Sequence, residues 1–201
     1  TYTRERVTNR PAVADHRANV AKNLMTLSTT FDQAWLKHNY EDAKGEYYNW
    51  NNGDVYNINP YWVLHKMTNE SKKDNYKGSA ILRYRPLKQL TLQATLGTDI
   101  NYFTFEEFAY PTSPGHERGW FERKNYQNRM HTAELLAIYK DKYKKWDYGA
   151  TLGGNIYKVD NETHIVTAQN MIMRSTKALQ SFTEKVNKED TYRKQINSLY
   201  G

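Results

Sequence analysis

Four segments between residues 76 and 157 alternate apolar and polar side chains with a period of two, and this pattern constrains the fold most. In the clearest segment one face carries Leu90, Leu92, Ala94, Leu96, Thr98, Ile100 and Tyr102. The residues between them include no large apolar side chain. Successive side chains of a β-strand point to opposite faces, so the alternation predicts strands with one apolar and one polar face. Similar alternation marks residues 76–85 and 146–157, and a weaker form marks residues 132–140.

The lengths and connections of these segments favour a transmembrane β-barrel over a soluble sandwich. Strands of soluble proteins usually run about 5–6 residues, whereas tilted membrane strands need about 9–11. The alternating segments reach the larger value, and their links alternate between short and long. Tight turns are expected at residues 85–89 and 141–145, with long polar loops at about 103–129 and 158–190. Short turns on one side and long loops on the other are typical of outer-membrane barrels.

Aromatic residues lie at the ends of the apolar stripes. The chain has 17 tyrosines and 5 tryptophans. Tyr76 and Tyr84 bracket one stripe, Tyr102 ends the next, and Trp146 and Tyr148 begin the last. Amphipathic rings suit membrane–water interfaces, so this placement matches the two aromatic girdles of a barrel. An antiparallel sandwich with one buried face also explains the alternation, but not the strand length or the loop asymmetry.

The predicted organisation is therefore all-β: an antiparallel transmembrane β-barrel segment of about five long strands. Residues 1–75 form a long extracellular loop region with a short helix from Pro11 to about Leu27 and a second helical turn from Phe31 to Leu36. Residues 76–157 form four barrel strands with short periplasmic turns. Residues 158–190 form an extracellular loop, and residues 191–201 begin the next strand, near Tyr192.

The sequence also lacks the usual marks of a signal peptide, a membrane-spanning helix, a metal site and a catalytic carboxylate pair. The first residues lack the charged and apolar regions of a signal peptide, and no run of about 18 apolar residues predicts a membrane-spanning helix. The chain has no cysteine. Its six histidines are scattered without metal-ligand spacing, and the neighbours Glu106 and Glu107 would point to opposite faces of a strand. We expect no enzyme activity, no metal and no cofactor.

A more specific indication comes from residues 31–99. Asn59-Pro60-Tyr61-Trp62 precedes Asn69, a strand with Gly78 and Tyr84, a tight turn, and a strand carrying Gly97-Thr98-Asp99. Upstream lie Phe31-Asp32, Trp35-Leu36, Gly45 and Trp50. This ordered set resembles the SusC/RagA family of TonB-dependent outer-membrane transporters. The resemblance is best from about residue 31 to residue 157 and looser before it.

The resemblance implies an internal segment of a 22-stranded barrel in the Gram-negative outer membrane. Family members import oligosaccharides or peptides with a SusD-like surface lipoprotein, and TonB supplies energy through regions absent from this segment. The barrel wall would contact outer-membrane lipid. Five strands leave two unpaired edges, and unpaired backbone groups are costly in lipid, so the segment should not act as a transporter by itself.

Aromatic loop residues are the candidate ligand or partner contacts: Trp50, Tyr61, Trp62, Tyr110, Trp120 and Phe121. Flat rings stack on sugars and anchor protein interfaces. They also pack within their own loops, and the motif position of Tyr61 and Trp62 favours that structural role.

Two other functions are compatible with parts of the pattern. A soluble antiparallel β-sandwich would bind carbohydrate or protein through surface aromatics, and its leucines would meet each other in a protein core. A nucleic-acid-binding β domain would use the net charge of +7, but the charges are dispersed and no basic run exceeds two residues. In a barrel, Leu92, Leu96, Leu135 and Leu152 face lipid, whereas Gln93, Asp99 and Asn155 face a wet lumen.

Overall fold

The computed structural model describes residues 1–13, 15–174 and 176–201. Six strands form one antiparallel sheet in chain order. They are β1 (Tyr2–Thr8), β2 (Met67–Tyr84), β3 (Leu90–Ala109), β4 (Trp120–Tyr143), β5 (Trp146–Met171) and β6 (Phe182–Tyr200). Three short helices and one 3-10 turn accompany them: α1 (Val20–Met25), α2 (Gln33–His38), α3 (Pro60–Lys66) and η1 (Leu179–Ser181). The all-β antiparallel prediction is confirmed.

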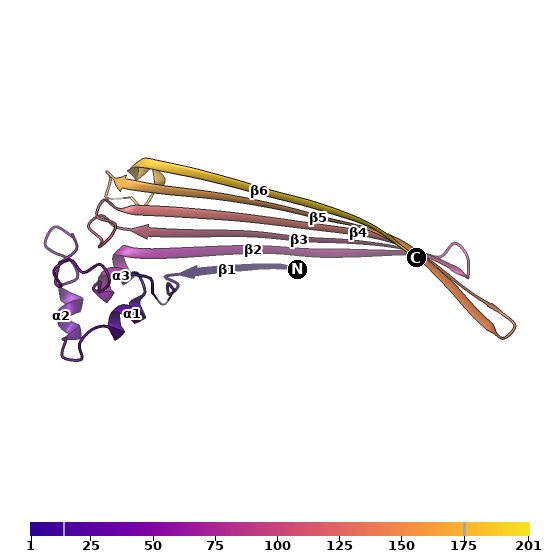
Figure 1. The fold of residues 1–201 in the computed structure, drawn as a ribbon, viewed down its shortest axis with the longest axis horizontal. Coiled ribbons are helices and arrows are strands. Elements are labelled where there is room, and N and C mark those ends of the chain that lie inside the picture. The colour runs from indigo at the N-terminus through magenta and orange to yellow at the C-terminus, as the bar shows by residue number, and fades with distance from the viewer. Residues whose placement is uncertain (14, 175) are drawn as a thin grey trace.

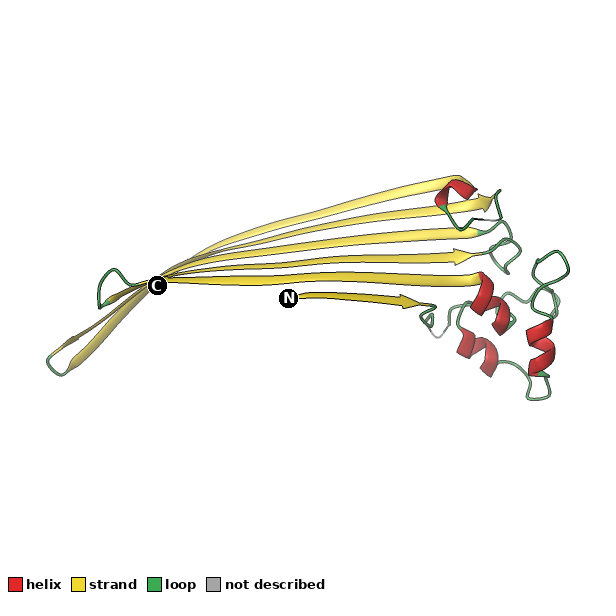
Figure 2. Ribbon diagram, turned by 180° about the vertical axis from the view of Figure 1, so that it is seen from behind, coloured by secondary structure: helices red, strands yellow, loops and turns green. Residues whose placement is uncertain are grey.

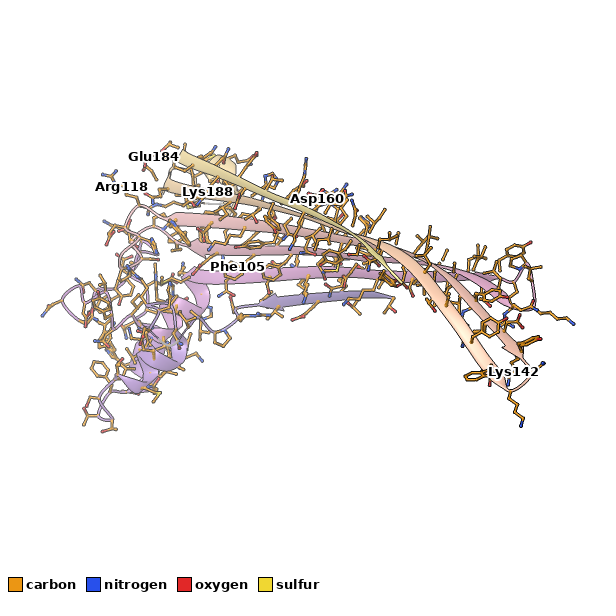
Figure 3. The ribbon with its side chains drawn as sticks, turned by 45° about the vertical axis from the view of Figure 1, so that its right-hand side comes forward. Phe105, Arg118, Lys142, Asp160, Glu184 and Lys188 are labelled. Carbon is orange, nitrogen blue, oxygen red and sulfur yellow. The ribbon has the colours of Figure 1, made fainter. Side chains whose placement is uncertain are left out.

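The sheet is long and strongly twisted (Figures 1 and 2). The helices gather at one end, which we call the loop end, and the turns after β2 and β4 lie at the other, the turn end. β4 and β5 run past the first residue of β3, because Leu90 pairs with Tyr139 and the β4–β5 hairpin continues to Tyr143 and Trp146. Lys142 marks this projecting hairpin in Figure 3, and Arg118 and Glu184 lie at the opposite end.

The strands are longer and the loops shorter than the alternation predicts. β2, β3, β4, β5 and β6 have 18, 20, 24, 26 and 19 residues. The predicted loop at 103–129 is reduced to residues 110–119, and the one at 158–190 is reduced to residues 172–181. Likewise, β2 begins at Met67 rather than at Tyr76, and β6 at Phe182 rather than near Tyr192. The extensions of β2, β4 and β6 are largely polar on both faces, and that of β3 has phenylalanines on both faces, so the period-two contrast disappears although the backbone pairing continues.

A sixth strand also departs from the prediction. β1 lies in the region predicted to contain only loops and helix, and it pairs residue by residue with β2 from Tyr2–Tyr76 to Thr8–Glu70. Its charged sequence is stabilised across the ladder: Arg6 Nε lies 2.6 Å from Glu70 Oε1, and the Tyr2 hydroxyl donates to Asp74 at 2.7 Å. Cross-strand pairs of this kind support a strand that has no apolar stripe of its own.

The helix α1 is shorter than predicted and α2 is shifted by two residues, because their caps lie inside the predicted ranges. Asn19 caps α1 by accepting a hydrogen bond from Lys22 N at 3.0 Å, so the chain before it is not helical. Ala14, within the predicted Pro11–Leu27 helix, lies outside the described residues. Asp32 caps α2. Asn59 and Pro60, which lie in the predicted loop region, instead start α3, with Asn59 as the N-cap and proline at the first position.

Candidate functional site

The sheet presents one apolar and one polar face over its turn-end half. On the apolar face, Leu92 pairs laterally with Ala137 and Leu152, while Leu135 lies between Ala94 and Gly154. These leucines are exposed: 66% for Leu135 and 59% for Leu152. The described residues contain no second sheet that covers them. The four leucines predicted to share a face do so.

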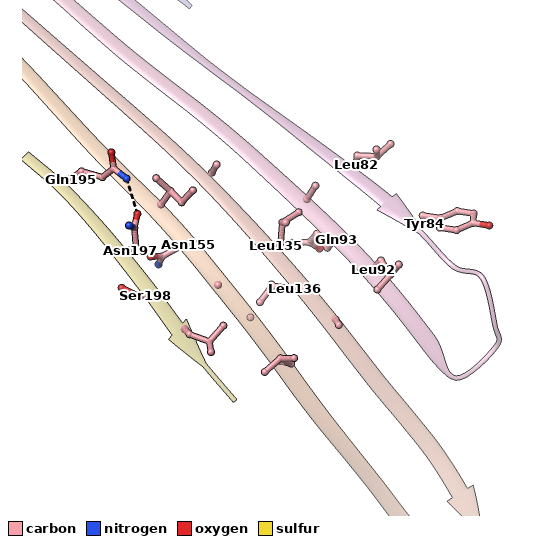
Figure 4. Close-up of a pocket in the computed structure, with 18 residues that line it drawn as sticks. Leu82, Tyr84, Leu92, Gln93, Leu135, Leu136, Asn155, Gln195, Asn197 and Ser198 are labelled. Carbon is pink, nitrogen blue, oxygen red and sulfur yellow. Dashed lines mark hydrogen bonds between the residues drawn. The ribbon is translucent and has the colours of Figure 1, made fainter.

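A shallow hollow of about 760 Å³ follows this apolar face (Figure 4). Its apolar lining includes Leu82, Leu92, Leu135, Leu152, Ile156 and Leu199. Toward the loop end it reaches Gln195 and Asn197, which are joined by a hydrogen bond of 3.0 Å from Gln195 Nε2 to Asn197 Oδ1. The lining of the hollow is therefore mostly aliphatic, with Gln93, Asn155 and Ser198 among the aliphatic residues and Gln195 and Asn197 at its loop-side end.

Aromatic rings bound the apolar face at both limits. At the loop-side limit, Tyr2 stacks on Tyr76 at a centroid distance of 4.7 Å, and Tyr76 meets Tyr102 edge-on at 6.3 Å. At the turn end, the hydroxyls of Tyr139 and Tyr148 both donate to Asp141 Oδ2 at 3.2 Å. The rings thus form one group on β1–β3 and another on β4–β5, separated by aliphatic side chains.

The polar face carries the predicted Gln93, Asp99 and Asn155 and a row of four asparagines across β2–β5. The asparagines are Asn75, Asn101, Asn128 and Asn161, which are lateral neighbours. Asn128 Nδ2 donates to Asn161 Oδ1 at 2.6 Å, and Lys77 Nζ lies 3.0 Å from Asp99 Oδ2. Phe103 and Tyr126 add a tilted ring pair at 6.0 Å. This face offers hydrogen bonds and ring surfaces to a ligand in water.

At the loop end, three segments that we call the cap pack together: the described parts of residues 9–66, 110–119 and 172–181. Trp62 Nε1 donates to Ser113 Oγ at 2.9 Å, Tyr47 N donates to Thr112 Oγ1 at 2.9 Å, and Arg174 pairs with Glu46 at 2.8 Å. One buried cluster contains Ile58, Trp62, Val63, Met67 and Ala109; a second contains Phe108, Phe121, Ala168, Met171 and Phe182. The cap is held by a true protein core.

Most of the predicted contact residues belong to this core. Trp62 is 0% and Phe121 2% exposed, so neither offers a surface to a ligand. Tyr110 is half-buried and packs against both clusters, and the half-buried Trp120 stacks on His116 at 5.1 Å. Tyr61 is half-buried on α3. This packing favours a structural role within the loops, rather than ligand contact, for Trp62, Tyr110, Trp120 and Phe121.

Trp50 contacts a cluster of partly exposed aromatic residues that the sequence did not predict. Its indole donates to the Tyr47 hydroxyl at 3.1 Å, and Phe31 meets it edge-on at 4.9 Å. Phe31 also contacts Trp35, which contacts Tyr48, at 6.2 and 5.9 Å. Phe31, Trp35 and Tyr48 are each more than one-third exposed. The spacing of Phe31 and Trp35, four residues apart at a helix start, was the available signal.

Burial and hydrogen bonding shift the pKa of several titratable groups of the cap. Burial lowers the pKa of His116, and the positive charge of Arg17 lowers it further. Backbone N–H groups of Glu46 and Lys44 lower the pKa of Asp42, as turn carboxylates often show. Among residues 1–13, 15–174 and 176–201 no three His, Asp or Glu side chains gather as metal ligands. Over the same residues, no helix is long and apolar enough to cross a membrane.

No protein-family model and no curated protein matches the chain. Among solved structures it is similar to the RagAB peptide transporter, with a TM-score of 0.60 at 19% identity over 71% of this chain. It is also similar to the RagAB peptide importer in the 'open-open' state (TM-score 0.52, 19% identity) and the 'closed-closed' state (0.50, 20%), each over 68% of this chain. The chain spans 16% of the length of each matched chain.

At these identities the similarity concerns the fold. The sheet has the fold of a segment of a RagAB-type transporter chain, which confirms the fold expected from the resemblance to the SusC/RagA family.

Proposed function

We propose that this chain is a wall segment of an outer-membrane β-barrel that imports large nutrients. The observation that carries the proposal is the exposed apolar face on strands of 18–26 residues, with rings at its loop-side limit on β1–β3 and at its turn end on β4–β5. A lipid bilayer covers such a face over about 9–11 residues per strand, and the rest of each strand then projects beyond it. The aliphatic zone faces lipid, and the asparagine row faces the lumen.

The loop end would lie outside the cell, because barrels of this class keep their short turns on the periplasmic side. The cap would then stand at the outer mouth, fixed by its own core. In this position the exposed group around Trp50 is available to a ligand or to a SusD-like lipoprotein. The buried Trp62 and Phe121 would hold the loops in place.

The names of the similar structures favour peptides as cargo, and oligosaccharides are the second class. The mixed charges, amides and rings of the polar face suit either polymer. TonB would act through parts of the barrel that lie outside this segment. No step requires the chain to make or break a covalent bond.

The test uses the full-length protein in its host. We expect it to sediment with the outer membrane, to migrate at a heat-dependent position on gels, and to support uptake of labelled peptides. Uptake should stop in a strain without TonB or after collapse of the proton gradient. Recovery of the protein from the soluble fraction, with no heat-dependent migration, would instead favour the soluble sandwich.

A further inference from the structure

At the loop-side limit of the aliphatic zone, one row of paired residues crosses all six strands. In strand order it contains Tyr2, Tyr76, Ile100, Arg129, Asp160 and Arg193. β1–β3 fill this row with rings and an isoleucine, whereas β4–β6 fill it with charges. Asp160 lies near the middle of the sheet in Figure 3. The boundary is thus aromatic on one side of the sheet and charged on the other.

The change from aliphatic to basic is abrupt on β4 and β5. Ala133 pairs with Ile156 in the aliphatic zone, and the next row on the same face contains His131, Lys158 and Gln195. Arg129 and Arg193 follow one row further on. Rows on the same face are about 7 Å apart, so basic groups begin one row above the aliphatic surface.

The Arg193 and Lys158 side chains project outward, whereas Arg129 and the carboxylates lie closer to the sheet. Arg193 Nε is 3.2 Å from Asp160 Oδ1, yet the Arg193 side chain is 68% exposed and that of Asp160 only 18%. Arg129 Nη2 lies 2.6 Å from Glu162 Oε1. Lys158 is exposed and forms no salt bridge with any described residue. Three basic groups therefore outnumber two carboxylates, and positive charge is outermost.

The hollow begins on the turn-end side of these three basic residues. Gln195 lies beside Lys158 in the ladder and lines the polar end of the hollow. From there the aliphatic lining continues toward the turn end through Leu135 and Leu92 (Figure 4). A molecule with an anionic head and apolar chains matches both parts. A free anion would use only the basic group.

We propose that Lys158 and Arg193, with Arg129 behind them, bind the phosphate of a phosphorylated lipid whose acyl chains lie in the hollow. Each guanidinium has five N–H donors, and its contact with a carboxylate leaves donors free for phosphate oxygens. Charge complementarity and continuity with the lipid-facing zone identify the occupant. The inference rests on the proposed function, because the apolar face must meet a membrane.

The experiment measures lipid binding to the full-length protein, purified without lipid, by titration under native mass spectrometry. The probes are dioleoyl phosphatidic acid and dioleoylglycerol, which differ only in the phosphate. The test variant is K158Q/R193Q. The matched control is K188Q/K194Q, which removes two charges from the polar face of the neighbouring strand. Heat-dependent migration verifies that each variant is folded.

We expect phosphatidic acid to bind the wild-type protein and the control variant equally, and K158Q/R193Q roughly tenfold more weakly. Dioleoylglycerol should bind all three proteins alike. The assignment is wrong if both variants lose equal affinity, or if the phosphate confers no preference on the wild-type protein. It is also wrong if glycerol 3-phosphate competes as well as the intact lipid, because the hollow would then contribute nothing.

The proposed function fails separately, when the protein does not enter the membrane at all. A protein that folds in the membrane but shows no preference for the phosphorylated lipid contradicts only this inference.

Discussion

The turn-end half of the sheet and the loop end are built from the same strands, but they place apolar side chains in different surroundings. At the turn end, Leu135 and Leu152 are well exposed, while at the loop end Phe121 and Phe182 are each only 2% exposed. All buried hydrophobic residues except Val159 lie in the cap or at strand ends next to it. The cap supplies its own apolar core, whereas no described residue covers the apolar face of the turn-end half. In the proposed barrel, the cap therefore lies in water and the apolar face of the turn-end half lies in lipid.

The largest effect should come from breaking the core of the cap. Trp62→Ala removes a fully buried ring and its hydrogen bond to Ser113, which should cost about 3–5 kcal/mol. Hydrogen exchange of the full-length protein should show lost protection in α3 and in residues 110–119, with the turn-end strands unchanged. Tyr61→Ala, on the same helix but half-buried, should have a smaller effect. Equal loss of protection at both ends would contradict the separation of the two regions.

The next largest effect tests the medium around the turn end. Leu135→Arg places a charge in the middle of the apolar face and should lower the unfolding free energy in liposomes by about 2–4 kcal/mol. Asn155→Arg, on the polar face of the neighbouring strand, should change it little. Urea titration of the full-length protein provides both values. Equal destabilisation by the two substitutions would mean that the faces do not meet different solvents.

A smaller loss of stability should result from disturbing the contact between Gly115 and Arg17, which joins two loops of the cap. Gly115 has φ +78°, and an added Cβ would overlap the Arg17 guanidinium, whereas Gly45 has φ +75° with open space around it. Gly45→Ala should cost only the backbone strain, about 1–2 kcal/mol, and Gly115→Ala should cost more. Limited proteolysis within residues 9–66 measures both. If the two variants are cleaved at the same rate, Arg17 does not hold the 110–119 loop.

The smallest effect is a pH dependence confined to the cap. Burial, and then the charge of Arg17, lower the pKa of His116, so the folded cap favours the neutral ring. The stabilisation is complete above the ordinary pKa of about 6.5 and is lost as the pH falls through the lowered value. The protection factors of residues 110–119, which correct for the intrinsic pH dependence of hydrogen exchange, should therefore fall in acid. His116→Gln should remove this pH dependence, and its persistence in that variant would exclude His116 as the cause.

The sequence predicted the part of the fold where the two faces differ. Leu92 and Gln93 were assigned to opposite faces because aliphatic and polar residues alternate there. The same method missed the outer extensions, since Lys124 and Asn125 are both polar and alternation between them carries no signal. β1 was missed for a related reason: Arg4 and Arg6 reveal a strand only when their partners Asp74 and Glu70 are known.

The sequence predicted that aromatic loop residues form the candidate site, but not which of these residues are exposed. Aromatic composition pointed to the loops, yet it did not distinguish the buried Trp62 from Trp50, which borders an exposed group. Burial depends on how three loops far apart in the sequence pack together. Likewise, Arg129 and Arg193 lie in one row only because of the register in which β4, β5 and β6 pair, and the sequence does not reveal that register.

The most direct test of the account compares the solvents of the two faces in the full-length protein in liposomes. Nitroxide labels would replace Leu152 or Asn155 one at a time, in a background with no other cysteine, and their relaxation would be measured with oxygen and with a water-soluble nickel chelate. The account predicts that the label at 152 collides with oxygen and is shielded from nickel, and that the label at 155 shows the reverse. Similar nickel accessibility at both positions would contradict a lipid-facing wall.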